Sequence, residues 1–255
     1  MTFADFWTNQ NNPELPKSVY LYGTRHLIVL ALVVVACIVF TAIFYKRSEK
    51  AKNILFKVFA SILLFFEIAS RIVNLIIEKN YTVENIAKIL LPMHICSVMV
   101  WVFIIAIFTK KRFLLEYGVI GGGIATLAFL AFPAVGLNRT YMSFTCIYST
   151  FSHMLGFVTV VLLMTLRQVK FEWKRIWQPL VCFVVMFLWG VLLNWVIFPG
   201  ADYMYLRNDP LELGLPIPYQ IVYAVILVVY TCAFYLGNCI IDKIRARKLK
   251  QKSAN

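Results

Sequence analysis

The segment Pro92-Met93-His94-Ile95-Cys96-Ser97 combines an imidazole, a thiol and a hydroxyl at the start of an apolar run that lasts to Phe108. A cysteine thiolate is a nucleophile, and a neighbouring imidazole can take the thiol proton, so these residue types are those of a catalytic cysteine with a histidine base. On a regular helix, however, His94 and Cys96 point in nearly opposite directions, whereas His94 and Ser97 share a face. If Cys96 is a nucleophile, its base must therefore come from another helix.

The same segment has structural interpretations that stay open at this point. Cys96 can be a buried, unreactive thiol, with His94 bonded to Glu67 across the bundle, and a disulfide between Cys96 and Cys146 is a further option. Pro92 is expected in the first turn of a helix, where proline is tolerated, so the sequence predicts no kink there.

A second polar group precedes this segment. Glu67, Arg71, Asn74 and Glu78 are spaced i, i+4, i+7 and i+11, which places them on one stripe of a helix facing a protein interior. One interpretation is a neutralised ion pair that locks helices together. The other is that Arg71, together with Arg25, binds an anion such as a lipid phosphate.

The elements that position these groups are predicted to be transmembrane helices. Of the 255 residues, 61% are hydrophobic and only 15% are charged, whereas soluble domains have about 25% charged residues. A helix needs about 20 apolar residues to cross a bilayer, and seven such runs lie at about 23–45, 54–78, 88–108, 114–133, 144–166, 176–198 and 217–241. We therefore predict an all-α, polytopic integral membrane protein with a seven-helix domain over residues 23–241, an N-terminal segment over 1–22 and a basic tail over 242–255.

Composition also bears on the partners of the chain. The net charge of +13 arises from short basic clusters between apolar runs, and no basic folded domain is left over, so nucleic-acid binding is not expected. The six cysteines form no C-x-x-C pair and no metal-ligand spacing, so neither a metal nor a cofactor is predicted. The sequence gives no prediction of the oligomeric state.

Charge bias orients the bundle. Most of the 25 basic residues lie between runs one and two, three and four, five and six, and after run seven. Because basic loops remain in the cytoplasm, the alternation predicts a multi-pass protein of the cell (plasma) membrane, with the N-terminus outside and the C-terminus in the cytoplasm.

In this orientation the hydrophilic side chains of the runs gather at one depth. The predicted outer half holds Arg25, His26, Glu67, Arg71, Asn74, His94, Cys96, His153 and Asn194, and the inner half holds almost no buried polar groups. Polar groups are costly in hydrocarbon, so we infer one water-accessible pocket that opens to the outer leaflet and is covered by the loop at about 199–216. His153 lies closer in depth to Cys96 than His26 does.

Several motifs, taken together, resemble a known family. They are Tyr22-Gly23-Thr24-Arg25-His26-Leu27, Leu91-Pro92-Met93-His94-Ile95-Cys96, Ser152-His153, Asn194-Trp195 and Tyr203-Met204-Tyr205-Leu206. Their order is similar to that in the YwaF-like bacterial membrane proteins, which look like relatives of the eukaryotic transmembrane protein 164. The resemblance covers nearly the whole chain, from about Tyr22 to Tyr235.

The resemblance implies a polytopic α-helical fold and, for the eukaryotic branch, a cysteine-dependent acyltransferase that remodels phospholipids. By position, the nucleophile is Cys96, and the associated histidines are His94 and His153. An outward-opening pocket has no access to cytosolic acyl-CoA, so we expect phospholipids as donor and acceptor. The reaction is then a transacylation or, with water, a hydrolysis.

Roles follow for the remaining candidates. His153 is expected to take the thiol proton, and His94, with Ser97 or backbone donors, to polarise the carbonyl. Arg25 and Arg71 are expected to hold the phosphate. The expected substrate-binding set is Arg25, His26, Glu67, Arg71, Ser97, Asn194 and Tyr203.

The alternative is a transporter or permease, or a non-enzymatic membrane protein with a buried Glu-Arg-His network. In that interpretation Glu67 and Arg71 form a polar stripe, and His94 is a proton-coupled gate. Transporters of this kind are built from inverted repeats and broken helices. The sequence shows no evident repeat, and we expect no broken helix at mid-membrane.

The charge bias makes one direct prediction. A reporter fused to the C-terminus should be located in the cytoplasm, because the last apolar run is followed by a strongly basic segment. Protease protection of the reporter in intact cells measures this, and a reporter exposed outside contradicts the predicted orientation.

Overall fold

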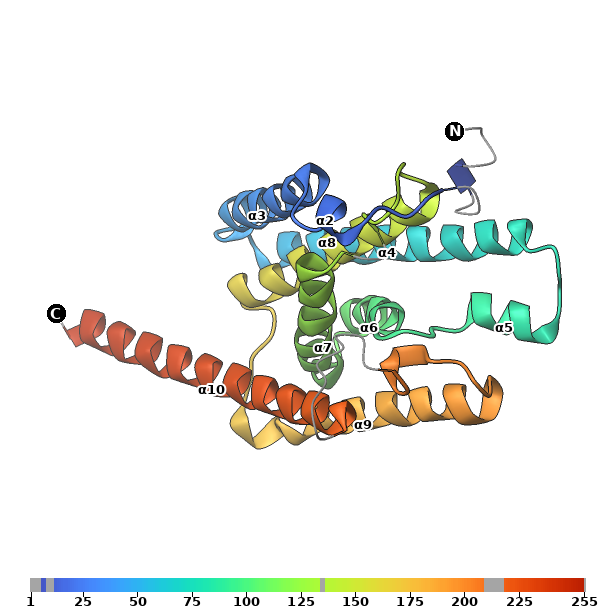
Figure 1. Ribbon diagram of the computed structural model, residues 1–255. Helices are drawn as coiled ribbons and strands as arrows, with labels where there is room; N and C mark the ends of the chain where they lie inside the picture. The colour runs from blue at the N-terminus through green and yellow to red at the C-terminus, as the bar shows by residue number, and fades with distance from the viewer. Residues whose placement is uncertain (1–5, 8–11, 134–135, 209–217, 255) are drawn as a thin grey trace. The chain divides into compact units, whose positions relative to one another are not determined.

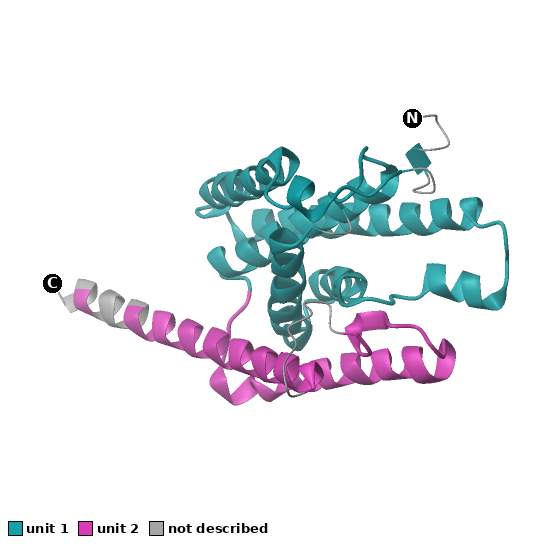
Figure 2. Cartoon of the chain, in the orientation of Figure 1, with its two compact units in different colours: residues 1–168 teal, residues 169–255 magenta. Residues whose placement is uncertain are grey.

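The computed structural model describes residues 6–7, 12–133, 136–208 and 218–254 (Figure 1). The chain divides into two compact units, Met1–Gln168 and Val169–Asn255 (Figure 2). It is 78% helical. Among the described residues, the one pairing of extended segments is an isolated antiparallel β-bridge between Glu14 and Arg139.

The first unit contains most of the helices that cross the membrane. Its elements are α2 (Lys17–Tyr20), α3 (Thr24–Phe44), α4 (Glu49–Ile77), α5 (Val83–Leu90), α6 (Ile95–Thr109), α7 (Arg112–Ala131) and α8 (Phe144–Thr165). The second unit contains η1 (Trp173–Arg175), α9 (Trp177–Leu192), the π-helical segment η2 (Leu193–Ile197), η3 (Tyr203–Tyr205) and α10 (Tyr219–Ala254). Six helices of the described chain are long and apolar enough to span a bilayer, and the bent pair α5 and α6 makes seven if it forms one span. The prediction of an all-α, multi-pass membrane protein is confirmed.

The third span differs from the regular helix that was expected. α5 ends at Leu90, the backbone is non-helical over 91–94, and α6 begins at Ile95 with an axis bent by 56° (Figure 1). The prediction that Pro92 causes no kink was therefore wrong. Proline excludes the α conformation from the residue before it, and Leu91 is accordingly extended, with φ −82° and ψ 146°.

Short polar side chains set the starts of three helices. The hydroxyls of Ser48, Thr82 and Ser143 accept hydrogen bonds from backbone N–H groups in the first turns of α4, α5 and α8. Such N-caps satisfy donors that have no partner within the helix. The cap at Ser48 also explains why α4 begins before the apolar run predicted for it.

Small residues bring α6, α7 and α8 close together in the first unit. A Cβ atom added at Gly122 of α7 would lie 2.2 Å from the tip of the Phe103 ring of α6, and one at Gly156 of α8 would lie 2.9 Å from Thr126. Phe103 is only 2% exposed, so its ring fills the space that Gly122 leaves. Close approach at small residues is the usual way that membrane helices associate.

This contact predicts a position-specific effect of alanine. Gly122→Ala should lower the free energy of unfolding by about 1–3 kcal/mol, because the enclosed Phe103 ring must move. Gly118→Ala on the same helix is the matched control, since its Cβ would meet Phe103 at an ordinary 3.5 Å. Thermal unfolding in detergent compares the two variants, and equal midpoints would contradict the packing described here.

Candidate functional site

Cys96 lies in the first turn of α6, directly after the break in the third span. Its half-buried thiol donates a hydrogen bond to the Ala125 carbonyl of α7, with 4.0 Å between Sγ and the oxygen. The amides of Ile95, Cys96 and Ser97 belong to this first turn, where an α-helix supplies no backbone acceptor. The break therefore places a thiol and several backbone N–H donors at the same helix end.

His153 lies on α8 and is held in one tautomer. Its Nδ1 atom is 2.6 Å from the Ser149 carbonyl oxygen, and since a carbonyl only accepts, Nδ1 must carry a proton. In the neutral imidazole the lone pair then belongs to Nε2. The ring stacks on Phe129 of α7, with centroids 4.0 Å apart and planes inclined by 13°. Nε2 is therefore the acceptor nitrogen of this ring.

The Cys96 thiol and the His153 imidazole contact neighbouring turns of α7. Ala125, which receives the Cys96 thiol, and Phe129, which stacks on His153, are four residues apart and share a face. Carbonyl groups point towards the C-terminal end of their helix, so the Ala125 oxygen points towards the level of Phe129. α7 thus holds a thiol from α6 and an imidazole from α8.

His94 occupies a different position from the one expected. It is the exposed N-cap residue of α6, with φ −115° and ψ 157°, and does not lie on the helix that carries Cys96. The expectation that His94 and Ser97 share a helical face was therefore wrong. The chain is non-helical over 91–94, so Ser97 lies in α6 and His94 precedes the helix. Cys96 and Cys146 are both free thiols, so the structure contains no disulfide between them.

The polar stripe of α4 ties three other segments together. Glu67 is fully buried, pairs with Arg71 and accepts a hydrogen bond from the Tyr148 hydroxyl of α8. Arg71 also donates from Nε to the Leu90 carbonyl, 3.1 Å away, and its guanidinium lies 5.5 Å from the Trp101 ring centroid. Arg71 therefore contacts the third span on both sides of its break.

Tyr148 was not identified from the sequence. Its partner Glu67 lies 81 residues away along the chain, and a tyrosine in an apolar run is usual near membrane interfaces. The one signal in the sequence was Glu67 itself. A buried carboxylate needs more than one partner, and only Arg71 was evident, so a further donor to Glu67 was to be expected.

His26 is fully buried, and both of its ring nitrogens are occupied. The Tyr22 backbone N–H donates to Nδ1 over 2.9 Å, so Nε2 carries the proton and donates to the Leu130 carbonyl over 2.7 Å. Gly23 follows Tyr22 in the chain, and glycine is required there because a Cβ atom would lie 2.2 Å from the Val19 backbone oxygen. In this structure the motif around His26 joins the start of α3 to the end of α7.

Arg25 binds the loop after α7. Its Nη1 and Nη2 atoms donate to the backbone carbonyls of Arg139 and Thr140, at 3.0 and 2.8 Å. The N-terminal segment contacts the same loop, since the Leu15 N–H donates to the Asn138 carbonyl at 2.7 Å. Arg25 and His26 thus bind neighbouring backbone segments, the loop after α7 and the end of α7, at the predicted outer end of the first unit.

The second unit contains Asn194 and Tyr203, which bind each other. The fully buried Asn194 side chain donates to the Tyr203 carbonyl over 2.8 Å and accepts from the Tyr203 N–H over 2.7 Å. The Asn194 backbone carbonyl, which lies in the π-helical segment, accepts from Arg207 over 2.7 Å. These hydrogen bonds hold the Asn194-Trp195 motif and the Tyr203-Met204-Tyr205-Leu206 motif together. The prediction that the loop at about 199–216 covers a pocket falls partly outside the described residues.

Asp202 fixes the far side of this loop. Its carboxylate accepts hydrogen bonds from the backbone N–H groups of Arg207 and Asn208 and from the Asn208 side chain. Partial burial raises the pKa of Asp202, but these hydrogen bonds outweigh burial and hold the pKa below its ordinary value. This contribution to stability is present at neutral pH and is lost as the pH falls through the lowered pKa.

Buried polar groups also occur at the basic end of α7. Glu116 is fully buried and pairs with Arg112, with 2.8 Å between Nε and Oε1. The expectation that the predicted inner half holds almost no buried polar groups was therefore wrong. Arg112 lies one turn before Glu116, and this i, i+4 pairing allows a carboxylate to be buried near a helix end. Within the described residues, no group of three or more His, Cys, Asp or Glu side chains could hold a metal ion.

The comparisons with known proteins agree with these motifs. The model of the TMEM164 family matches residues 21–236. The chain belongs to this family. The match begins at the motif around His26 and ends in α10, so it includes every candidate residue described above. No curated protein and no solved structure matches the chain.

Membership of the TMEM164 family confirms the resemblance to transmembrane protein 164 that the sequence motifs indicated. The narrower resemblance to YwaF-like proteins stays a prediction. The structure uses two of the motifs, around His26 and Asn194, to fix backbone segments.

The buried network on α4 leads to a stability prediction. Tyr148→Phe should lower the free energy of unfolding by about 1.5–3 kcal/mol, since it removes a hydrogen bond to a buried carboxylate. Tyr81→Phe is the control, because the Tyr81 hydroxyl bonds the Leu75 carbonyl while its side chain is 62% exposed. If both variants melt with the wild type in detergent, the network does not stabilise the bundle.

Proposed function

We propose that this protein is a membrane-embedded, cysteine-dependent acyltransferase that transfers phospholipid acyl chains, by transacylation or, with water, by hydrolysis. One observation carries the proposal. The Cys96 thiol and the His153 imidazole contact the same face of α7, and Nε2 of His153 carries the lone pair. A thiol nucleophile and an imidazole base are the two groups that a thiol-dependent mechanism uses.

The first step forms an acyl-enzyme. Nε2 of His153 takes the proton of the Cys96 thiol, and the thiolate attacks the carbonyl carbon of a phospholipid ester. Backbone N–H groups at the start of α6 stabilise the oxyanion, with His94 beside them as the N-cap. The tetrahedral intermediate collapses, the ester C–O bond breaks, and the leaving alkoxide of the lysophospholipid takes the proton from His153.

The second step returns the enzyme to its starting state. His153 takes the proton of an acceptor hydroxyl, which attacks the thioester carbonyl. The C–S bond then breaks, the acyl chain passes to the acceptor, and the thiolate regains the proton from His153. With water as the acceptor the product is a free fatty acid.

The polar residues beyond the reacting groups bind the head group in this proposal. A pocket of about 260 Å³ lies at the C-terminal end of α4, lined by Asn74, Ile77, Glu78, Lys79 and Ile89. Lys79 lines this pocket, and Arg71, one turn before Asn74 on the same helix, is the residue that we assign to the phosphate. The remaining substrate-binding candidates within the first unit are Arg25, His26, Glu67 and Ser97. The location we propose is the plasma membrane, with phospholipids of the outer leaflet as partners.

A transporter is the second candidate function, and the broken span favours it. Discontinuous helices at α5 and α6 and the π-helical segment η2 are features of transporters that bind solutes within the membrane. In that case the Glu67 and Arg71 pair, rather than Cys96, is the essential group.

The nucleophile provides the test. Cys96→Ala should abolish transfer of a labelled acyl chain between phospholipids in proteoliposomes, and His153→Gln should lower the rate by about 100-fold or more. Cys37→Ala is the control, since this half-buried thiol lies on α3. Unchanged turnover in Cys96→Ala excludes the thioester mechanism, and uptake of a solute driven by a pH gradient would then support the transporter.

A further inference from the structure

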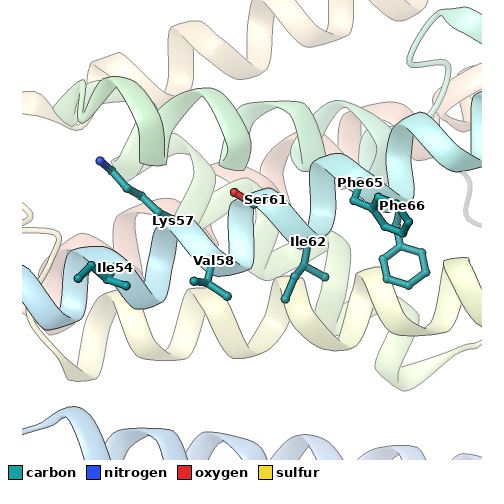
Figure 3. Close-up of a pocket in the computed structure, with 7 residues that line it drawn as sticks. All are labelled: Ile54, Lys57, Val58, Ser61, Ile62, Phe65 and Phe66. Carbon is teal, nitrogen blue, oxygen red and sulfur yellow. The ribbon is translucent and has the colours of Figure 1, made fainter.

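α4 presents a groove that is separate from the candidate site. The groove has a volume of about 450 Å³ and is lined by Ile54, Lys57, Val58, Ser61, Ile62, Phe65 and Phe66 (Figure 3). These residues form two neighbouring i, i+4 rows, one through Lys57, Ser61 and Phe65 and the other through Ile54, Val58, Ile62 and Phe66. A furrow between two such rows runs along the helix.

Lys57 is the charged group of this groove and lies on an exposed face of the helix. No residue of the described chain forms an ion pair or a hydrogen bond with its ammonium group. A lysine in a lipid-facing segment is costly unless its long side chain carries the charge to the interface. Figure 3 shows the side chain extending back along the helix, in the direction of the helix start.

The position of Lys57 fits the level of lipid head groups. It follows the first residue of α4 by eight residues, or about 12 Å of helix, and the segment before it contains Lys46, Arg47 and Lys50. From Ile54 to Phe66 the groove extends for about 18 Å, close to the depth of one leaflet, which is about 15 Å of hydrocarbon. The groove thus begins near a basic interface and continues into the apolar layer.

We propose that this groove is a binding site for an anionic phospholipid of the leaflet at the basic end of α4, which the charge bias assigns to the cytoplasm. The Lys57 ammonium pairs with the lipid phosphate, and one acyl chain lies along the apolar furrow from Val58 to Phe66. Charge complementarity selects this occupant, because an unpaired cation at the head of an apolar groove matches an anionic head with an attached chain. The site is independent of the chemistry proposed for Cys96, since it uses none of the same residues.

Native mass spectrometry tests the site on the full-length protein. Protein released from mixed micelles of phosphatidylglycerol and phosphatidylcholine should retain phosphatidylglycerol in preference. Lys57→Gln should weaken this retention about fivefold, and Lys57→Arg should restore most of it. Lys50→Gln is the matched control, because Lys50 is an exposed lysine of the same helix outside the groove.

A second variant separates a specific site from general attraction to an anionic surface. Ser61→Phe keeps the charge of Lys57 but fills the furrow, and it should lower lipid retention as much as Lys57→Gln does. Equal effects of Lys57→Gln and Lys50→Gln, or unchanged retention in Ser61→Phe, overturn the proposal. A change of oligomeric state in Ser61→Phe with lipid retention unchanged would assign the groove to a second copy of the chain and likewise overturn it.

Discussion

The break in the third span imposes a requirement that the surrounding structure satisfies. Backbone groups within a bilayer need partners from the protein, because lipid chains supply none. Where α5 ends, the Leu90 carbonyl receives the Nε–H of Arg71. The guanidinium is itself a charge that must be neutralised, which Glu67 does, and the other oxygen of Glu67 accepts from Tyr148. An interrupted helix thus depends on an interaction chain that crosses from α5 through α4 to α8.

The same break gives Cys96 its chemical setting. In an uninterrupted helix the amide of Cys96 would bond the carbonyl four residues earlier, and its thiol would be one more side chain in an apolar run. Because α6 starts at Ile95, the thiol lies beside first-turn amides, and the small residues of α7 allow α6 and α8 to approach. The setting of Cys96 and the packing of the helices are therefore linked, since Gly122 and Gly156 set how closely α6, α7 and α8 meet.

The sequence predicted the all-α membrane class and the limits of several spans, because both depend on hydropathy and charge averaged over many residues. The length of each apolar run and the basic clusters between runs are averages over many residues, so α3, α7 and α8 begin and end close to their predicted limits. The break at Pro92 depends on one residue. Proline is tolerated in a first turn and disruptive elsewhere, and the sequence did not show that a helical turn already precedes Pro92 in α5.

Around the candidate site, the sequence predicted a contact within one helix but not a contact between distant helices. Glu67 and Arg71 pair as their spacing indicated, since an i, i+4 interaction is local. Tyr148 was missed because its contact with Glu67 joins distant helices. The interaction between Asn194 and Tyr203 shows a related limit, because the Asn194 side chain, which was expected to bind substrate, binds the backbone N–H and carbonyl of Tyr203.

The broken span is common to both functions considered, so it does not decide between them. In a transporter an interrupted helix exposes backbone groups to a solute, and in the proposed acyltransferase it exposes a thiol and oxyanion donors. The difference lies in His153. Ser149 holds the Nδ1 proton, and stacking on Phe129 fixes the ring, so the basic Nε2 has a defined direction. The proposed thiol mechanism uses this nitrogen as its general base, whereas the transporter alternative assigns the proton-coupled gate to His94. The two alternatives therefore place the essential proton on different histidines, one fixed on α8 and one exposed at the start of α6.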